Sequence, residues 1–360
     1  MQDSIRIGII GCGGIAKGKH MPGLSRLDGV EMTAFCDGVP KRAHEAMVEF
    51  GSGDSKTYMD YRVLLEDPQI DVVHVCTPND SHAEIVVAAL EAGKHVMCEK
   101  PMAKTSAEAQ IMLETAVRTG RKLTIGYQNR FRPDSQHLYQ VCRRGDLGDI
   151  YFAKAHAVRR RGVPTQGVFI DERRQGGGPL IDIGTHALDL TLWMMDNYRP
   201  KMVVGTAYHK LSRRYNAANA WGPWDPEKFT VEDSAFGFVV MQNGATVFLE
   251  SSWALNTLQI GEARCTLCGT EGGADMWDGL RINGEDLGKL YVNQVEPAVK
   301  GADFYEPKLE KAGDREMEAW IQAIREDREP LVRPEEAFVV AQILDAIYQS
   351  AQSGRPVYFD

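Results

Sequence analysis

Short apolar runs alternate with helical stretches along the first 126 residues of the chain. The runs that read as buried strands are 5–10, 30–36, 71–76, 95–98 and 122–126. The stretches that read as helices are 17–27, 40–50, 61–66, 82–92 and 106–119. Because helices between successive strands form right-handed crossovers, this alternation predicts an α/β domain with a parallel, doubly wound sheet.

The pattern changes after residue 126, where we place the boundary between a first domain, 1–126, and a second, 127–360. A polar and aromatic link and a helix, 134–144, lead into longer segments of alternating character. The later strands are predicted at 150–160, 201–211, 234–241, 245–253, 263–268 and 288–292, and the last helices at 314–326 and 334–353.

The turn Gln242-Asn243-Gly244 predicts that the strands on either side of it form an antiparallel hairpin. The second domain is therefore expected to be an α/β domain with a large, mainly antiparallel open sheet. We expect helices on one face of this sheet and a second subunit on the other, which would make the protein a homo-oligomer.

Composition narrows the classes of function. The chain has 360 residues, 43% hydrophobic and 25% charged, as in a globular protein large enough for two cores. Its net charge of -9 argues against nucleic acid or an anionic membrane as partner. No apolar run approaches the ~20 residues that span a bilayer, and the N-terminus has no cationic segment followed by an apolar one. We expect a cytoplasmic protein.

The seven cysteines are odd in number and mostly lie in apolar runs, so they read as reduced core thiols rather than a disulfide framework. Cys265 and Cys268 form a single C-x-x-C without a second pair at zinc spacing. We therefore expect no metal site.

The first strand runs into a glycine-rich turn that opens a helix. Gly11 permits the tight turn, Gly13 lets the backbone approach a pyrophosphate, and Ala16 is the third small residue. Gly14 and Ile15 lie where the helix begins, and free N–H groups there suit phosphate oxygens. This strand, turn and helix predict a dinucleotide-binding (Rossmann) domain.

Asp37 follows the second strand, where a carboxylate accepts hydrogen bonds from the adenosine ribose. The same charge repels a 2′-phosphate, so NAD is favoured over NADP. Lys41 and Arg42 follow closely, as possible phosphate ligands or as the solvated first turn of the next helix, which we favour.

Polar residues follow two further strands and should meet at the carboxyl edge of the sheet. Asn79 and His82 either contact the nicotinamide ribose or form a helix cap and first turn, and both readings stay open. Lys100 leaves the next strand between Glu99 and Pro101. The predicted cofactor contacts at this edge are Thr77, Pro78, Asn79, His82, Glu99 and Lys100.

The segment from Pro179 to Met195 can form one helix, with Asp182, His186 and Asp189 on a single face. Its other residues are apolar nearly all round, which is typical of a buried helix. A carboxylate and an imidazole buried one turn apart require polar partners, and a functional site supplies them.

Together, the glycine turn, Thr77-Pro78-Asn79 with His82, Glu99-Lys100-Pro101 and the glycine-led helix resemble the glucose–fructose oxidoreductase / inositol dehydrogenase / rhizopine catabolism (Gfo/Idh/MocA) family of NAD(P)-dependent oxidoreductases. The resemblance spans essentially the whole chain. It implies a Rossmann domain, an α/β domain with a large open sheet, and a dimer or tetramer. It also implies that Lys100, Asp182 and His186 surround the reacting hydroxyl.

Oxidation of a secondary alcohol requires hydride departure to nicotinamide and removal of the hydroxyl proton. We expect His186 to take the proton, Lys100 to stabilise the developing alkoxide, and Asp182 to orient them or hold an adjacent hydroxyl. Whether Lys100 or His186 is the formal base stays open. The predicted substrate contacts are Lys100, Tyr127, Asn129, Arg159, Arg161, Asp182 and His186.

The resulting hypothesis is NAD-dependent oxidation of a ring secondary hydroxyl of a sugar or glycoside, at C3, because several family members form 3-keto sugars. The alternatives are an inositol 2-dehydrogenase, a glycosidase or lyase that uses bound NAD for transient oxidation, and a non-catalytic dinucleotide sensor. The segments 159–162, 163–169 and 221–226 are expected to recognise the substrate, although the tryptophans of 221–226 equally suit an oligomer contact.

Overall fold

The computed structural model describes residues 4–295 and 311–359, which fold into two compact units. Unit 1 comprises Met1–Phe131 and Leu309–Phe338, and unit 2 comprises Arg132–Lys308 and Val339–Asp360. The first division falls five residues beyond the predicted boundary at 126. The larger difference is the late segment ending at Phe338, which belongs to unit 1 and not to the predicted second domain, 127–360.

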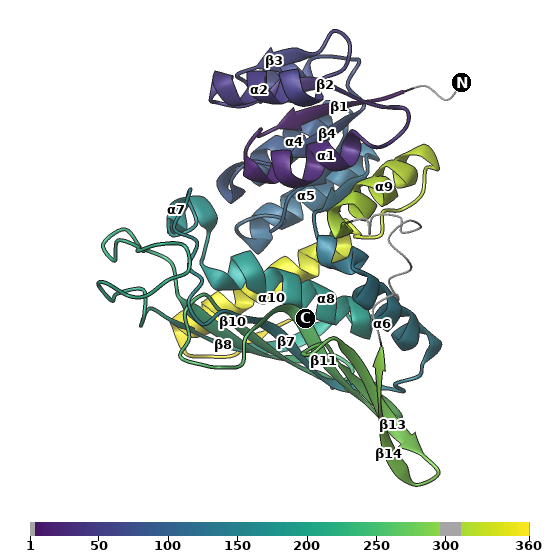
Figure 1. Ribbon diagram of the computed structural model, residues 1–360, viewed down its shortest axis with the longest axis vertical. Coiled ribbons are helices and arrows are strands. Elements are labelled where there is room, and N and C mark those ends of the chain that lie inside the picture. Colours follow the sequence, from purple (N-terminus) through teal and green to yellow (C-terminus); the bar gives the residue numbers. More distant parts are fainter. Residues whose placement is uncertain (1–3, 296–310, 360) are drawn as a thin grey trace, which may run out of the picture. The chain divides into compact units, whose positions relative to one another are not determined.

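The sheet of unit 1 has six strands in the order β3-β2-β1-β4-β5-β6, and every neighbouring pair is parallel. This confirms the predicted doubly wound sheet (Figure 1). Only the short edge strand β3 was not predicted. The strands are β1 (Ile5–Ile10), β2 (Val30–Cys36), β3 (Lys56–Tyr58), β4 (Val72–Val75), β5 (His95–Cys98) and β6 (Leu123–Ile125).

Two helices of unit 1, α3 and α5, begin at residues whose side chains cap the first turn. Asp60 accepts from the N–H of Arg62 at the start of α3, and Thr105 accepts from Glu108 at the start of α5. The helical segments are η1 (Ala16–His20), α1 (Met21–Leu24), α2 (Pro40–Phe50), α3 (Tyr61–Leu65), η2 (Asn79–Ser81), α4 (His82–Glu91), α5 (Ser106–Thr119), η3 (Gln128–Phe131) and α9 (Ala312–Arg325).

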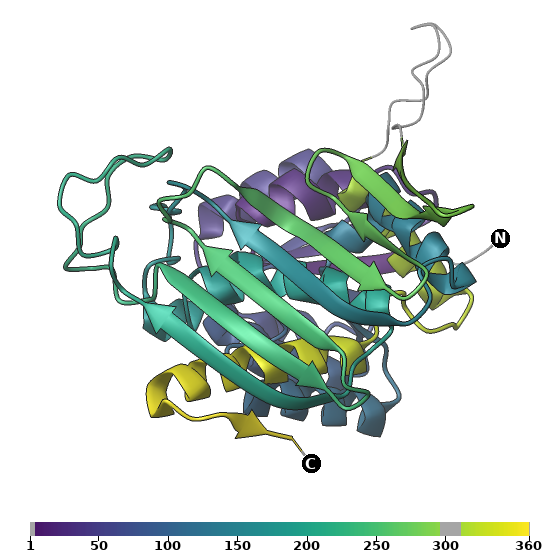
Figure 2. The same cartoon turned by 90° about the horizontal axis from the view of Figure 1, so that it is seen from below.

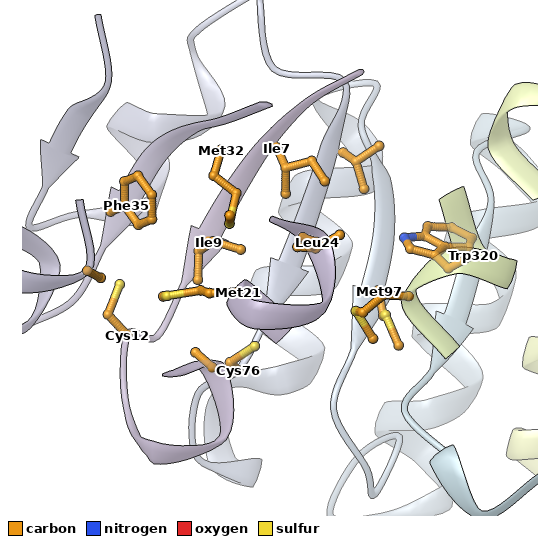
Figure 3. Packing of buried hydrophobic residues seen from close by; sticks show 14 of the residues in the cluster. Ile7, Ile9, Cys12, Met21, Leu24, Met32, Phe35, Cys76, Met97 and Trp320 are labelled. Atoms are coloured by element: carbon orange, nitrogen blue, oxygen red, sulfur yellow. The ribbon is translucent and has the colours of Figure 1, made fainter. Parts of the chain in front are cut away.

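Helix α9 joins unit 1 because its apolar face completes the core there. Met317, Trp320 and Ile321 are almost fully buried in a cluster with residues of β1, β2 and α1. Figure 3 shows Trp320 beside Met97, at the edge of the side chains that line the sheet. The predicted helix is therefore present, but it packs with residues some 300 positions earlier in the chain.

Unit 2 contains a nine-stranded sheet in the order β14-β13-β12-β11-β7-β10-β9-β8-β15. Among the described residues, every neighbouring pair of strands is antiparallel except β10 with β7, which confirms a large, mainly antiparallel sheet. The predicted β9–β10 hairpin is present, and Gly244 adopts the positive φ of 88° in its turn.

Its strands are β7 (Ile150–Val158), β8 (Pro200–Tyr208), β9 (Ser234–Met241), β10 (Thr246–Ser252), β11 (Gly261–Gly269), β12 (Gly272–Asp275), β13 (Leu280–Asp286), β14 (Lys289–Val295) and β15 (Val357–Tyr358). The helical segments are α6 (Pro133–Arg144), α7 (Glu172–Gln175), η4 (Leu180–Gly184), α8 (Thr185–Met195) and α10 (Pro334–Ser353), of which α10 begins in unit 1.

Helices cover one face of this sheet, as predicted. Helix α8 packs on β7 and β11, and α10 lies so close to β8 and β9 that a Cβ at Gly205 or Gly237 would fall within 2.6 Å of Ile347. Figure 2 looks onto the opposite face, which carries no helix among the described residues. Phe238 and Phe248 meet there with ring centroids 5.3 Å apart, and Phe248 is 40% exposed.

No helix in the described part of the chain is long and apolar enough to cross a membrane.

Candidate active site

The glycine turn after β1 has two kinds of glycine. Gly11 has a φ of 91°, and a Cβ there would lie 2.7 Å from the carbonyl of Cys76, so only glycine fits. Beside Gly13 and Gly14, by contrast, a Cβ would meet nothing within 4 Å. This open side leaves room for a pyrophosphate to approach the backbone at the start of a helix, so the turn fits a dinucleotide.

Asp37 is held beside this turn by two backbone hydrogen bonds. One carboxylate oxygen accepts from the N–H of Cys12 at 2.9 Å and the other from the N–H of Val39 at 2.8 Å. Each oxygen keeps a second lone pair for a further donor. The carboxylate is thus fixed at the edge where the adenosine ribose was predicted to bind.

His82 lies between the chain segments that follow β4 and β5. Its ring is fully buried, with Nδ1 2.9 Å from the carbonyl oxygen of Pro101 and Nε2 2.9 Å from that of Thr77. His82 is also the first residue of α4, so it lies in the first turn of a helix, as one of the two predicted alternatives states. Burial lowers the pKa of His82, although both carbonyls favour a proton on the ring. Its side chain therefore links the Lys100 segment to the Thr77 segment, and its predicted contact with ribose stays a prediction.

The other polar residues of the Thr77 segment are held locally. The Ser81 hydroxyl donates to Thr77 Oγ1 at 2.8 Å, and Asn79 is 6% exposed in the single turn η2. These contacts fix the backbone between β4 and α4.

Glu99 is buried in an ion-pair cluster that sequence reasoning missed. Its carboxylate pairs with Lys19, and Lys19 Nζ lies 3.0 Å from Glu316 of α9. Burial alone would raise the pKa of Glu99, but the Lys19 ammonium and the His20 hydrogen bond hold it well below its usual value. Glu99 is therefore ionised at neutral pH.

Two histidines extend this cluster. His20 Nε2 lies 2.8 Å from Glu99 Oε1, and His20 Nδ1 lies 2.9 Å from His74 Nδ1. Burial, together with nearby positive charge, lowers the pKa of both rings, so both are neutral. The pattern requires His20 to donate from Nε2 to Glu99 and to accept at Nδ1 from His74.

Lys100 emerges from this cluster at the end of β5. Its backbone N–H donates to Glu99 Oε2 at 3.2 Å, and the Lys100–Pro101 peptide bond is cis. The side chain is half-buried. Tyr127, which follows β6, is 1% exposed, and Asn129 lies half-buried in η3. Glu99 thus anchors the backbone of Lys100, and the contact of Lys100 with the cofactor stays a prediction.

Asp182 and His186 lie on one continuous buried helix in unit 2. A π-helical turn, η4, carries Asp182 and leads directly into α8 with His186. The side chains are 5% and 8% exposed. Asp182 Oδ2 accepts from the indole N–H of Trp253 at 3.1 Å, and Trp253 is fully buried after β10. Tight packing also explains Gly184, where a Cβ would lie 2.9 Å from Ser251 Oγ.

Arg159 and Arg161 line a surface cavity of about 580 Å³ at the ends of β7 and β11. Arg159 forms a two-pronged ion pair with Glu262 at 2.6 and 2.7 Å and lies 4.9 Å from the ring centroid of Trp221. Arg161 donates to Asn256. The structure therefore brings together two predicted substrate-binding segments, 159–162 and the Trp221 loop.

Among the described residues, no group of three or more histidine, cysteine, aspartate or glutamate side chains is arranged to hold a metal ion. Cys265 and Cys268 are both free and lie three positions apart on β11, so their side chains point to opposite faces.

Within unit 1, the structure brings the glycine turn, the Asp37 carboxylate and the Lys100 segment to the carboxyl edge of the parallel sheet. Within unit 2, it places Asp182 and His186 on one buried helix. The cluster around Glu99 and the contact between Asp182 and Trp253 went unpredicted because their members are far apart in the sequence.

Comparisons with known proteins agree with this architecture. The family description "Oxidoreductase family, NAD-binding Rossmann fold" matches residues 5–127, and "Oxidoreductase family, C-terminal alpha/beta domain" matches 141–359. D-glucoside 3-dehydrogenase of Escherichia coli K12 is 34% identical over 354 residues, covering 98% of this chain and 97% of that protein.

Two further relatives are informative. Inositol 2-dehydrogenase of Salmonella typhimurium is 35% identical over 147 residues, which cover 40% of this chain and 43% of that protein. The crystal structure of an oxidoreductase domain protein from Kribbella flavida is 25% identical with a TM-score of 0.83, covering 99% of each chain. Since both family descriptions match and together span nearly the whole sequence, the chain belongs to the Gfo/Idh/MocA family of oxidoreductases.

Proposed function

We propose that the protein oxidises a ring secondary hydroxyl of a sugar or glycoside, at C3, to a keto-sugar, with NAD as hydride acceptor. The observation that carries this proposal is the buried helix with Asp182 and His186, in a chain whose other unit holds a dinucleotide-binding turn. The Escherichia coli relative named D-glucoside 3-dehydrogenase, similar along nearly its whole length, supports the substrate class and the C3 position.

In this proposal, nicotinamide accepts the hydride when the cofactor is bound, and the protein handles the proton. His186 accepts the hydroxyl proton, and Lys100 donates a hydrogen bond to the same oxygen as it gains negative charge. Trp253 donates a hydrogen bond to one oxygen of Asp182 and so holds its carboxylate in place, and Asp182 orients the reacting groups or binds an adjacent sugar hydroxyl. Glu99 and His82 fix the backbone on either side of Lys100.

The proposed cofactor is NAD rather than NADP. The open side of Gly13 and Gly14 accommodates the pyrophosphate, and the Asp37 carboxylate, fixed by two N–H groups, accepts from the ribose. A 2′-phosphate there would meet negative charge.

We also propose that the protein is a cytoplasmic homo-oligomer. The exposed aromatic face of the unit 2 sheet is suited to a second copy of the chain. All seven cysteines are free, as in a reducing compartment.

A screen of NAD and NADP reduction over inositols, free pyranoses and aryl glycosides tests the function, with products analysed for the oxidised carbon. We expect NADH formation and a 3-keto product from a pyranose or glycoside. Lys100→Ala and His186→Ala should each lower kcat at least ~100-fold, as loss of a proton-transfer group does. Near-native turnover in both variants would refute the assigned roles.

Inositol 2-dehydrogenase is the second candidate, favoured by the Salmonella typhimurium relative over part of the chain. Reduction of NAD with inositols alone would select it. Cleavage of an aryl glycoside without net NADH would indicate a glycosidase or lyase that recycles its cofactor. Dinucleotide binding without reaction on any compound would indicate a sensor.

A further inference from the structure

Glu232 is a buried carboxylate at the start of the helix that carries Asp182 and His186. It lies two residues before β9 and is 3% exposed. Its Oε2 accepts from the N–H of Gly178 at 2.8 Å, and its Oε1 accepts from the N–H of Leu180 at 3.1 Å. The first N–H groups of a helix have no partner within the helix, so Glu232 supplies what this helix start lacks.

Tyr348 of α10 holds the carboxylate from the other side. Its hydroxyl donates to Glu232 Oε1 at 2.9 Å. Three donors therefore converge on one buried carboxylate, two from the helix start and one from a helix much later in the chain.

Two glycines before this helix leave room for Glu232 and Tyr348 to approach it. A Cβ at Gly177 would lie 2.0 Å from the Tyr348 hydroxyl, and one at Gly178 would lie 2.2 Å from the backbone oxygen of Glu232. Any side chain would displace these contacts. Gly177 and Gly178 thus let the helix start approach Glu232 and Tyr348, a role separate from the dinucleotide turn.

An ionised carboxylate at this buried position costs folding free energy. Burial raises the pKa of Glu232 to about 7, although the N–H groups of Gly178 and Leu180 and the Tyr348 hydroxyl favour ionisation. No described cation forms an ion pair with it. An uncharged acceptor would avoid most of this cost, so stability alone does not account for a glutamate here.

We propose that Glu232 is a positioning residue, whose ionised carboxylate fixes the first turn of the helix and thereby the places of Asp182 and His186 in the proposed reaction. The inference rests on the proposed function. Leu180 is two positions before Asp182, so a shift at this turn moves the carboxylate directly.

Protonation weakens the contact. A carboxylic acid has one O–H where the carboxylate had an acceptor. Two of the three groups facing it are backbone N–H groups that can only donate, so the Tyr348 hydroxyl would have to turn from donor to acceptor. The titratable group nearest to Glu232 is Tyr348. Glu172 of α7 acts on Tyr348 in turn: burial raises the pKa of the Tyr348 hydroxyl, and the negative charge of Glu172 raises it further. Asp233, the next residue, turns instead to the N–H groups of Leu211 and Ser212.

The kinetic test compares Glu232→Gln with the wild type across pH. At pH 8 we expect kcat to fall about tenfold, as for loss of one charge-assisted hydrogen bond, with the KM for NAD unchanged. The ratio of wild-type to variant kcat should shrink below pH ~7, where the wild-type carboxyl is itself protonated. Glu250→Gln, which alters a half-buried carboxylate of the same sheet, is the control and should leave kcat unchanged.

A ratio that is constant with pH, or an equal loss in the Glu250 control, would overturn the proposal. If Glu232→Gln does not fold, Tyr348→Phe replaces it, because that variant keeps the charge and removes one donor. Its kcat should fall less at pH 8, and the pH at which kcat declines should move upward. An unchanged pH profile in Tyr348→Phe would count against the positioning role.

Amide hydrogen exchange on the intact protein gives a readout that needs no substrate. At pH 8, Glu232→Gln should speed exchange at Gly178 and Leu180 while β7 stays protected. If the wild type oxidises no sugar, the proposed function fails and exchange still decides the role of Glu232. Unchanged protection at both amides would refute it.

Discussion

Glu99 in unit 1 and Glu232 in unit 2 are equally buried, at 5% and 3% exposure, yet their pKa values move in opposite directions. Glu99 has the Lys19 ammonium and the His20 ring beside it. Glu232 has only uncharged donors. Burial is the same in both places, so the presence of a cation decides whether the charged carboxylate is favoured.

The two regions therefore respond differently to pH. Glu99 binds its proton less tightly in the folded protein, so its contribution to stability exists above the ordinary carboxyl pKa and is lost as the pH falls through the folded value. Glu232 binds its proton more tightly when folded, so its contribution is greatest below pH ~4.5 and declines until about pH 7.

Removal of the cation from the first region should have the largest effect. Lys19→Met keeps the unbranched stem but leaves Glu99 charged, buried and without its ammonium partner. We expect the free energy of unfolding to fall by about 3 to 5 kcal/mol in urea denaturation at pH 7.

Lys17→Met provides the matched control, because Lys17 pairs with the exposed Glu45 and an exposed pair contributes little. Adding Glu99→Gln to Lys19→Met should restore part of the stability. A loss as small as that of the Lys17 variant would show that the cation does not distinguish the two regions.

Replacement of the carboxylate in the second region should act mainly through pH. Ionised Glu232 costs about 3 kcal/mol of stability above pH 7, a figure that follows from the rise of its pKa from 4.5 to about 7. Glu232→Gln has no carboxyl group to ionise and so avoids this loss of stability. The stability of the variant relative to the wild type should therefore increase between pH 5 and pH 8. Urea titrations at several pH values measure the change, and a pH-independent difference would contradict it.

The smallest expected change in stability comes from a variant of the second region that leaves Glu232 itself in place. Tyr348→Phe removes one donor to Glu232 and should lower stability by about 1 kcal/mol. The loss of that donor should also raise the pKa of Glu232, shifting the pH range over which stability declines. If the range stays in place in urea titrations of the variant, the hydroxyl does not help to ionise the carboxyl.

The sequence allowed the repeating parts of the fold to be predicted. Helix and strand periods located most elements of unit 1, and the Asn243-Gly244 turn located the β9–β10 hairpin. Strands β12 and β13 were missed, because Gly272, Gly273 and Gly284 weaken the pattern and β13 is largely exposed. Helix α9 was predicted, but its partner Lys19 lies 297 positions away and no local pattern reports such a contact.

The candidate site shows the same limit. Local motifs were enough to single out Gly11, Asp37 and the buried helix, because the residues adjacent to each in the sequence indicate its role. The partners that hold the site were not visible, since Glu232 meets Gly178 across 54 positions and Trp253 meets Asp182 across 71. The catalytic roles of Lys100, Asp182 and His186 remain predictions.

The return of α9 to unit 1 has a consequence for biosynthesis. A ribosome that has completed Phe131 must still translate all of the intervening chain before Glu316 and Trp320 exist, which takes roughly 10 to 40 s at about 5–20 residues per second. Until then, the nascent N-terminal part has an unfilled apolar surface, and Lys19 has only one of its two carboxylates. Because synthesis proceeds from the N-terminus, unit 1 cannot complete its core until α9 has been made, and chaperones have the greatest opportunity to act during that interval.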